Sequence, residues 1–364
     1  MIRVNRVAFA EMLARVEPGR STRNFLEQSS CYIFQGGWVS TFNDEVCCRT
    51  KTDFPDEVEG AVQGRHLKDT LDGLTDEEVT VSVEGPEFRL TTPRKKAGIR
   101  LEREVRLPVD QVETPESWTP LDNPDAFAKA VKLVTETAGK DEEEFMTVCV
   151  HVTPSALEAT DRWQASRYEV ATGFQAECLV RAKSLRAAGA LDITKVGETP
   201  NWAHFRNKAL VISVRRHVAP FQDLAQHFAF TGQPVDLPRG AVEAAKLGGV
   251  FSADDKDNNK VFVFLEDGRM RVRGEGANGW AEAEPECGYA GPPVSFRISP
   301  KTLEDIVKDH QRCEVSPSKL LVRGDRWTYL TVLGAAKPTQ APAPAAAEED
   351  APAYAEGGDG DDPY

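Results

Sequence analysis

The feature that most constrains this sequence is a pattern that recurs every 118 residues. Leu67, Leu185 and Leu303 are 118 residues apart, and each lies in a stretch of helical apolar spacing that leads into strand-like segments. A second amphipathic helix precedes each stretch. Its apolar positions are Phe9, Met12, Leu13 and Val16, then Phe127, Ala130, Val131 and Val134, and more weakly Ala244, Leu247, Gly248 and Phe251. Self-similarity at a fixed period indicates a chain built from repeated units.

The repeat predicts an α+β fold of three domains, each with two helices packed on antiparallel sheets. Proline-containing polar stretches between the copies place the domains at residues 1–119, 120–236 and 237–334. Residues 335–364 are rich in Ala, Pro, Gly and acidic side chains. That composition cannot support a hydrophobic core, so we expect a disordered tail.

The charge balance argues against nucleic acid at first sight. The chain carries a net charge of −14, of which the tail contributes −6 through seven acids and one base. No apolar run is long enough to span a bilayer and the N-terminus lacks a secretory signal, which favours the cytoplasm. Seven scattered cysteines, odd in number, favour reduced and mostly buried thiols.

Motifs for catalysis are absent from the sequence. It contains no HExxH, GxSxG or Walker pattern, and we expect neither enzymatic activity nor a metal or cofactor. One GxGxxG string occurs at residues 274–279. It is followed by an alternating, strand-like segment instead of a helix, so it predicts a hairpin turn and not a dinucleotide site.

Basic residues recur on the predicted helices. Arg65, Lys183 and Lys301 each stand two residues before a repeated leucine. Further bases on these helices are Lys68, Arg186, Lys308, Lys129, Lys132 and Lys246. A solvated helix face and a track that neutralises phosphates without reading bases explain this register about equally well.

The repeat and three short motifs together resemble a known family. Ala159-Thr160-Asp161-Arg162, Val180-Arg181-Ala182-Lys183 and Tyr329-Leu330-Thr331-Val332 are similar to stretches of the bacterial DNA sliding clamp, the beta subunit of DNA polymerase III. The resemblance spans residues 1–333. It implies a head-to-tail homodimer that closes a ring, with helices inside, sheets outside and duplex DNA in the hole. Such a ring is a non-catalytic processivity factor that slides on DNA, opened by a clamp loader ATPase and bound by polymerase and other clamp-binding-motif proteins.

The resemblance also implies three groups of site residues. Arg23 and Lys183 correspond to DNA-contacting positions. Val250 and Phe251 would face Ile99 and Leu101 across the dimer interface, with plain core packing as the alternative for each. The partner-peptide pocket falls on Met146, Thr160, Arg162, Trp163, Gln164, Ala165, Ser299, Thr302, Leu330, Thr331, Val332 and Leu333. Trp163 fits core packing and partner contact equally.

Two further features depart from the family. Arg162-Trp163-Gln164-Ala165 stands where the family has Gly-His-Arg-Leu, which questions whether the pocket takes the usual motif. The tail end resembles the acidic tails of single-stranded DNA-binding proteins, and is either a tethered partner motif, a phosphate mimic that competes for the hole, or an inert solubilising segment. A cellular chromosome and a phage or plasmid replicon both remain open. The rival interpretation of the whole chain is a repeat-built protein-binding scaffold that does not encircle DNA.

Overall fold

The computed structural model describes residues 1–252 and 259–335, so the predicted tail lies outside the described residues apart from Ala335. Three units share one order: a strand, a helix, four strands, a second helix and three strands. The first unit has β1 (Ile2–Asn5), α1 (Arg6–Val16), β2 (Cys31–Gln35), β3 (Trp38–Phe42), β4 (Val46–Lys51), β5 (Gly60–Gln63), α2 (Gly64–Gly73), β6 (Glu78–Glu84), β7 (Glu87–Thr91) and β8 (Lys96–Glu102).

The second and third units repeat this order. The second has β9 (Thr119–Pro120), α3 (Pro124–Thr137), β10 (Cys149–Val152), β11 (Ala156–Thr160), β12 (Gln164–Glu169), β13 (Cys178–Arg181), α4 (Ala182–Gly189), β14 (Lys195–Glu198), β15 (Trp202–Arg206) and β16 (Leu210–Arg215). The third has β17 (Gln233–Asp236), α6 (Gly240–Ser252), β18 (Val261–Glu266), β19 (Arg269–Gly276), β20 (Gly279–Ala283), β21 (Val294–Ile298), α7 (Pro300–Asp309), β22 (Arg312–Val315), β23 (Lys319–Arg323) and β24 (Trp327–Val332), followed by β25 (Gly334–Ala335).

The strand pairs refine the predicted boundaries. β9 pairs with β14, and β17 pairs with β22 of the third unit. A boundary at 236/237 would therefore separate β17 from the unit whose sheet it joins. The second unit begins at β9 and the third at β17.

The helices form where their apolar spacing predicts them. Asn5 and Asn123 cap α1 and α3, because each side chain accepts a hydrogen bond from the backbone N–H three residues later. Leu67 and Leu185 of α2 and α4 are fully buried, as is Leu303 of α7. The predicted α+β architecture is therefore confirmed, with each helix pair packed on antiparallel strands.

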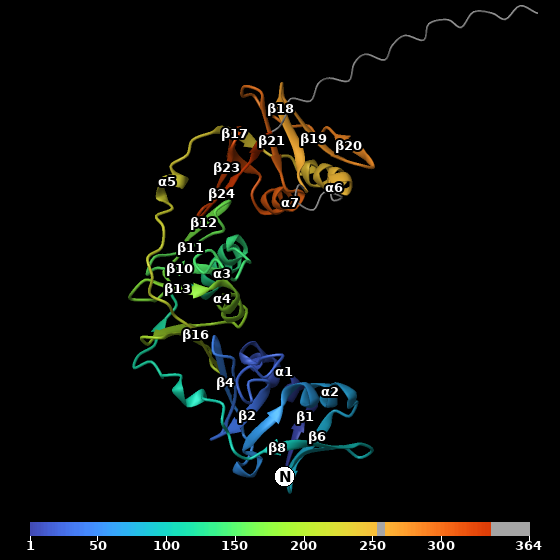
Figure 1. Ribbon diagram of the computed structural model, residues 1–364, viewed down its shortest axis with the longest axis vertical. Helices are drawn as coiled ribbons and strands as arrows, with labels where there is room; N and C mark the ends of the chain where they lie inside the picture. Colours follow the sequence, from blue (N-terminus) through green and yellow to red (C-terminus); the bar gives the residue numbers. More distant parts are fainter. Residues whose placement is uncertain (253–258, 336–364) are drawn as a thin grey trace, which may run out of the picture.

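The three units lie along an arc (Figure 1). The helix pairs α1/α2, α3/α4 and α6/α7 all lie on its concave side, and the sheets lie on the convex side. Alternation along the strands produces this division, because one set of side chains packs under the helices and the other faces outward. In β2, for example, Tyr32 and Phe34 join the core under the helices, whereas Ile33 joins a separate outer cluster.

Two strand pairs join the units. β4 pairs antiparallel with β16 from Val46↔Val214 to Thr50↔Leu210, and we call this the first joint. β12 pairs with β24 from Gln164↔Thr331 to Tyr168↔Trp327, the second joint. In both, the third of the four strands between a unit's two helices pairs with the last strand of the next unit.

A connecting segment covers the outer face of each joint. Residues 103–118, the first strap, pack Leu107, Val109 and Val112 against an outer cluster that includes Phe42 and Trp202. Residues 216–232, the second strap, contain the short helix α5 (Ala225–Phe228). The second strap buries Leu224 and Phe228 against Ala165 and Leu330 of the second joint and against Leu321 of the adjoining strand β23.

The GxGxxG string forms a hairpin, as predicted. β19 and β20 pair from Val272↔Ala283 to Gly276↔Gly279. Gly274 is needed for packing, because a Cβ there would lie 1.8 Å from the Gly248 carbonyl oxygen of α6. Close backbone contact thus replaces an apolar side chain at Gly248, which explains the weak helical pattern of the third copy.

The remaining expectations concern thiols, membranes and metals. All seven cysteines are free and buried. Burial raises the pKa of the Cys47 thiol to about 11 and that of Cys313 to about 12. In the described part of the chain, no helix has the length and apolarity to cross a membrane, and no group of His, Cys, Asp or Glu is placed to hold a metal ion.

Candidate nucleic-acid interface

The helical layer carries all but one of the cations predicted to contact DNA. Arg65 and Lys68 lie on α2, Lys129 and Lys132 on α3, Lys183 and Arg186 on α4, Lys246 on α6, and Lys301 and Lys308 on α7. Arg23 is exposed in the loop after α1. All ten are exposed except Lys68, which is half-buried. The repeated register thus places cations from all three units on the concave side.

Several of these cations have carboxylate partners. Arg65 and Lys301 pair with the acid four residues later, at 3.5 Å to Asp69 and 2.6 Å to Asp305. Lys183 has the same register, but its position i+4 is Ala187. Exposed pairs of this kind are worth less than about 1 kcal/mol, so a phosphate can compete for the cation.

Two more pairs cross between elements. Lys68 Nζ lies 3.5 Å from Glu17, and Lys246 Nζ lies 3.2 Å from Glu304 of α7. By contrast, Arg23, Lys129, Lys132, Lys183 and Lys308 have no carboxylate within 4 Å among the side chains that the structure describes, which exclude Asp309. These five are the cations most accessible to an anionic ligand.

Arg186 has a second role that its register did not predict. Its Nη2 donates to the Thr135 carbonyl at 2.7 Å, and its Nε donates to Thr135 Oγ1 at 3.1 Å. Thr135 lies in the last turn of α3, where carbonyls have no partner within the helix. Arg186 therefore fixes α4 against the C-terminus of α3.

A groove of about 980 Å3 lies between the first and second units and brings Arg23, Lys183 and Arg186 together. It adds three cations that sequence reasoning missed: Arg20, Lys140 and Arg181. Arg20 pairs with Glu17, and Arg181 lies 3.3 Å from Glu45. These three do not recur at the helical register, so the repeat gave no signal for them.

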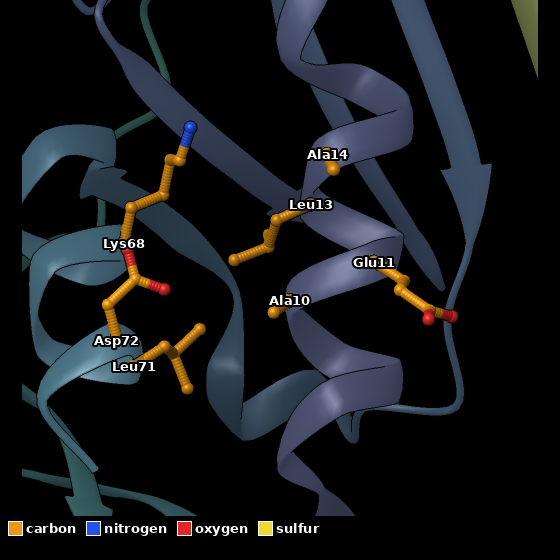
Figure 2. A pocket seen from close by; sticks show the side chains of 7 residues that line it. All are labelled: Ala10, Glu11, Leu13, Ala14, Lys68, Leu71 and Asp72. Carbon is orange, nitrogen blue, oxygen red and sulfur yellow. The ribbon is translucent and has the colours of Figure 1, made fainter.

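A smaller groove of about 310 Å3 separates α1 from α2 (Figure 2). Leu13 and Leu71 point toward each other across it, Lys68 and Asp72 line the α2 side, and Glu11 points away. One cation and two carboxylates line the groove, so it carries charges of both signs and does not favour an anionic ligand. It is the packing seam of two helices and adds only Lys68 to the interface.

The residues predicted for a partner pocket fall into separate places. Thr160 and residues 162–165 meet Leu330–Val332 across the second joint, where the Val332 N–H donates to the Trp163 carbonyl at 2.8 Å. Leu333 follows β24, and its N–H donates to Ser318. Met146 packs beside Val148 and Leu179 in another cluster. Ser299 and Thr302 belong to the start of α7, in the helical layer.

Trp163 is not a core residue. Its side chain is 68% exposed, beside Val332 at 38%. Arg162 adopts a left-handed backbone conformation (φ 74°) in the turn between β11 and β12. Its guanidinium pairs with Glu144 at 2.9 Å. The second joint thus presents an exposed aromatic ring next to an exposed valine.

Sequence reasoning missed the second strap at this place. Arg323 donates to the carbonyls of Phe228 at 2.9 Å and Phe230 at 3.2 Å, which ties the strap to β23. The signal was four apolar residues, Phe221, Leu224, Phe228 and Phe230, within a polar proline-containing stretch. The strap occupies the apolar outer face of the joint and leaves Trp163 beyond its edge.

The residues predicted for a dimer interface differ in exposure. Val250 is 65% exposed and Phe251 half-buried, whereas Ile99 and Leu101 are buried in the core of the first unit. Core packing, the alternative to a dimer contact, is therefore what the structure shows for Ile99 and Leu101. The opposite face of β8 exposes Lys96, Gly98 and Arg100 instead, because alternate strand residues face opposite sides.

No protein-family model matches the sequence, and a comparison with curated protein sequences finds no match. The structure, however, is similar to the DNA polymerase III beta subunit from Thermotoga maritima, at 15% identity and a TM-score of 0.77. It is also similar to the DNA polymerase sliding clamp from Pseudomonas aeruginosa (15%, 0.75) and to that from Bartonella birtlesii bound to griselimycin (14%, 0.79). Each match covers 91% of this chain and 98% of the other. The chain therefore has the fold of the bacterial DNA polymerase III beta sliding clamps.

Proposed function

We propose that this protein is a DNA sliding clamp, a non-catalytic processivity factor that closes a ring around duplex DNA and tethers a replicative polymerase. The observation that carries the proposal is the arc itself. Three helix pairs face its concave side, and they present cations from every unit toward the same space. Positive charge of this kind neutralises phosphates without reading sequence.

Ring closure is supported by a rule that both joints obey. The third of the four strands between a unit's two helices pairs with the last strand of a neighbouring unit, as β4 does with β16 and β12 with β24. The third unit's corresponding strand is β20, which lies at a sheet edge. The first unit's last strand is β8, which pairs with β5 only at Leu101 and Glu102. Pairing β20 of one copy with β8 of another would apply the same rule head to tail.

The two strands also have complementary charge. On its outer face, β8 presents Lys96 and Arg100, and also Glu102, which lies where β8 already pairs with β5. β20 and the residue after it place Trp280, Glu282 and Glu284 on the outer face, opposite the side that packs on α6. Glu282 is half-buried and also pairs with Arg271 and Arg273 of β19 at 3.8 and 3.7 Å, so Glu284 is the exposed acid at this edge. Opposite charges placed across a strand pair stabilise it, and unpaired edges are otherwise prone to unwanted pairing. We call this proposed contact the seam.

The weak ion pairs of the concave side suit sliding. A closed ring stays on DNA because of topology, so its contacts need not be strong. Arg65, Lys68, Lys246 and Lys301 are already partly neutralised by neighbouring acids. A phosphate contact that replaces such an ion pair adds little binding free energy, so the ring stays free to move along the duplex.

Polymerase and other proteins with clamp-binding motifs would bind at the second joint, and a clamp loader ATPase would open the ring. Trp163 and Val332 form the exposed apolar surface on which a partner motif would pack. The Bartonella birtlesii clamp was solved with griselimycin bound, which supports ligand binding by this fold. A cytoplasmic location stays a prediction.

Retention on circular DNA tests the proposal. Rings assembled on a nicked circle should survive a wash at 1 M NaCl and should dissociate when the circle is linearised. Electrostatic binding without encirclement would instead fall steeply with salt on either form of DNA. Release from the intact circle at high salt would refute the clamp.

The rival is a protein-binding scaffold that never surrounds DNA. It requires no head-to-tail assembly, so its mass in solution is that of one chain. Light scattering or sedimentation at micromolar concentration separates the two readings: two copies per particle support the ring, and a strict monomer supports the scaffold.

A further inference from the structure

Two adjoining hollows lie on the outer face of the first joint. Their volumes are about 490 and 350 Å3, and both are lined by Trp38, Arg206 and Val211. The larger one runs beside the first strap and includes Arg49 and His204. We call the two together the junction groove. It lies on the face opposite the helices, so the proposed contact with duplex DNA does not use it.

The junction groove is unusually rich in unpaired cations. Lys51, Lys195, Arg206 and Lys208 line the smaller hollow, and no carboxylate does. Throughout the described part of the chain, none of these four, nor Arg49, has a carboxylate within 4 Å. Negative charge is confined to the larger hollow, where the strap contributes Asp110 and Glu113.

Two of the cations are held over aromatic rings. Lys51 Nζ lies 5.6 Å from the centre of the Trp38 ring, and the Arg206 guanidinium lies 4.3 Å from that of Trp118. These ring faces are therefore covered and are not offered to nucleobases, which bind single-strand platforms by stacking. The arrangement favours carboxylates as ligands over single-stranded nucleic acid.

The second joint shows that this charge is not a property of the repeat. Glu169 and Asp325 occupy the positions equivalent to Lys51 and Lys208. Arg167, the equivalent of Arg49, has Glu158 opposite it on the neighbouring strand and pairs with it at 3.3 Å.

In the first joint, Ser40 stands opposite Arg49 instead, and the Arg49 side chain donates to the Val109 carbonyl of the strap. Arg312 and Arg323, the equivalents of Lys195 and Arg206, are cations as well, but they pair with Asp236 at 3.7 Å and Glu314 at 3.3 Å. The first joint thus differs from the second in having cations without carboxylate partners, which suits it to an acidic ligand.

We propose that the junction groove binds the acidic C-terminal segment of this chain, residues 348–362. That segment contains seven carboxylates, no base and one aromatic residue, Tyr354. Its charge complements the groove, and no other stretch of 15 residues in the sequence combines so many acids with no base.

The segment is also long enough to reach the groove. It follows Ala335 of β25, and at about 3.3 Å per residue it extends up to about 40 Å at Glu348 and about 90 Å at Asp362. One unit of this size is about 35 Å across. β25 pairs with β21, and part of the third unit as well as the whole second unit lies between β21 and the first joint (Figure 1), so it is the far end of the extended segment that reaches the groove. Docking there would hold the acidic segment on the outer face, away from the cations proposed to face DNA.

Zero-length crosslinking of the full chain tests this. Carbodiimide joins a carboxylate to a lysine amine only where the two are in direct contact, and mass spectrometry identifies the pair. We expect peptides from residues 348–362 joined to Lys51, Lys195 and Lys208, with a yield that falls in 0.5 M NaCl. Mixing labelled and unlabelled chains shows whether the segment comes from the same copy or another; either origin supports the proposal.

A matched pair of charge reversals controls for non-specific attraction. Lys208→Glu should lower the yield at Lys51 and Lys195 at least about threefold. Arg326→Glu makes the same charge change at an exposed position outside the groove and should leave the yield unchanged. Equal losses in both variants would overturn the proposal, as would links from the segment to Lys129, Lys132 or Lys183, which would place it against the concave side.

Lysine acetylation gives a second readout that needs no crosslink. Removing residues 336–364 should raise the reactivity of Lys51, Lys195 and Lys208 several-fold. Half-buried Lys319, which lies outside the groove, should react equally in the full chain and in the chain that ends at Ala335. Unchanged reactivity after removal of residues 336–364 would mean that another ligand or none occupies the groove, and would overturn the proposal. The clamp function is not at stake in either test, because neither uses DNA.

Discussion

The two joints share one strand register but differ on their outer faces. In the first, His204 and Ser213 are paired across the strands; in the second, the equivalent positions are Leu321 and Leu330. The His204 ring bonds Ser213 Oγ at 2.8 Å and Thr199 Oγ1 at 3.0 Å, whereas the two leucines contact the second strap. A repeated backbone thus supports a polar, cationic surface at one joint and an apolar one at the other.

The straps differ accordingly. The second inserts large apolar side chains, Leu224 and Phe228, over the leucine pair. The first spreads smaller anchors, Leu107, Val109 and Val112, beside the polar pair and leaves the junction groove next to it. The difference indicates that a duplicated joint can acquire a second kind of ligand through side chains alone, without a change of fold.

The largest expected effect concerns the second strap. Phe228→Ala removes a buried ring and should lower the free energy of unfolding by about 3 kcal/mol. Val112→Ala in the first strap removes only two carbons and should cost about 1.5 kcal/mol. Urea unfolding followed by circular dichroism measures both. An equal or larger loss for Val112→Ala would contradict the view that the second strap is the more tightly anchored.

The polar pair makes the first joint sensitive to acid. Burial lowers the pKa of His204 from 6.5 to about 4, so the folded protein holds this ring neutral while the unfolded chain binds a proton below pH 6.5. Stability from this group is therefore complete above pH 6.5 and is lost as the pH falls toward 4, by about 2 kcal/mol at pH 5.

A His204→Gln variant provides the control for this loss. The variant keeps a polar side chain but cannot titrate, so its stability curve from pH 7 to 5 should be flatter by about 2 kcal/mol. Native-state hydrogen exchange should locate the loss at β15 and β16 and spare β23 and β24, where leucines replace the pair. Parallel curves for the two proteins would exclude His204 as the source.

The seam would be a third joint without a strap, so it depends more on charge. Lys96→Glu/Arg100→Glu should raise the dissociation constant of the dimer at least about tenfold, because like charges then face Glu282 and Glu284. Adding Glu282→Lys/Glu284→Lys should restore most of the affinity. Sedimentation at several concentrations measures this. A dimer that ignores both changes would have to form through another surface.

The smallest effect separates two equivalent arginines. Arg323 donates to two strap carbonyls, whereas Arg206 is stacked on Trp118 of the first strap. Arg323→Ala should cost about 2 kcal/mol and Arg206→Ala about 1 kcal/mol. The difference of about 1 kcal/mol is measurable by thermal unfolding of the two variants side by side, and its reversal would mean that stacking holds a strap better than hydrogen bonds do.

Much of the fold was predictable because apolar spacing is a local signal. The period of 118 located three pairs of helices, and Leu67, Leu185 and Leu303 are each buried as the spacing predicts. The joints were not predictable in this way. Thr50 and Leu210 pair across 160 positions of sequence, and nothing near either residue specifies its partner.

The candidate site was predictable in part for the same reason. Cations at a helical register can be placed on one face from the sequence, whereas their pairing with Asp69 and Asp305 four residues later depends on side-chain conformations that the spacing does not specify. Alternation along β8 does not show which face meets the core, so an interface and plain core packing are both compatible with Ile99 and Leu101 in the sequence; the structure buries both. The resemblance supplied the region around Trp163, but no local pattern predicted that a strap would cover the neighbouring leucines.

The straps have a mechanical consequence. At each joint, a strap that is covalently continuous with the strands packs over the outer face. The strap would have to detach before the paired strands could separate. A seam of the kind proposed would rest on one short ladder, limited by the five residues of β20, with no chain crossing it. Force applied to such a dimer would therefore separate the two chains at a seam before it opened a joint within either chain. Such a ring would therefore open at the proposed seams, whereas the two strapped joints within each chain would stay closed.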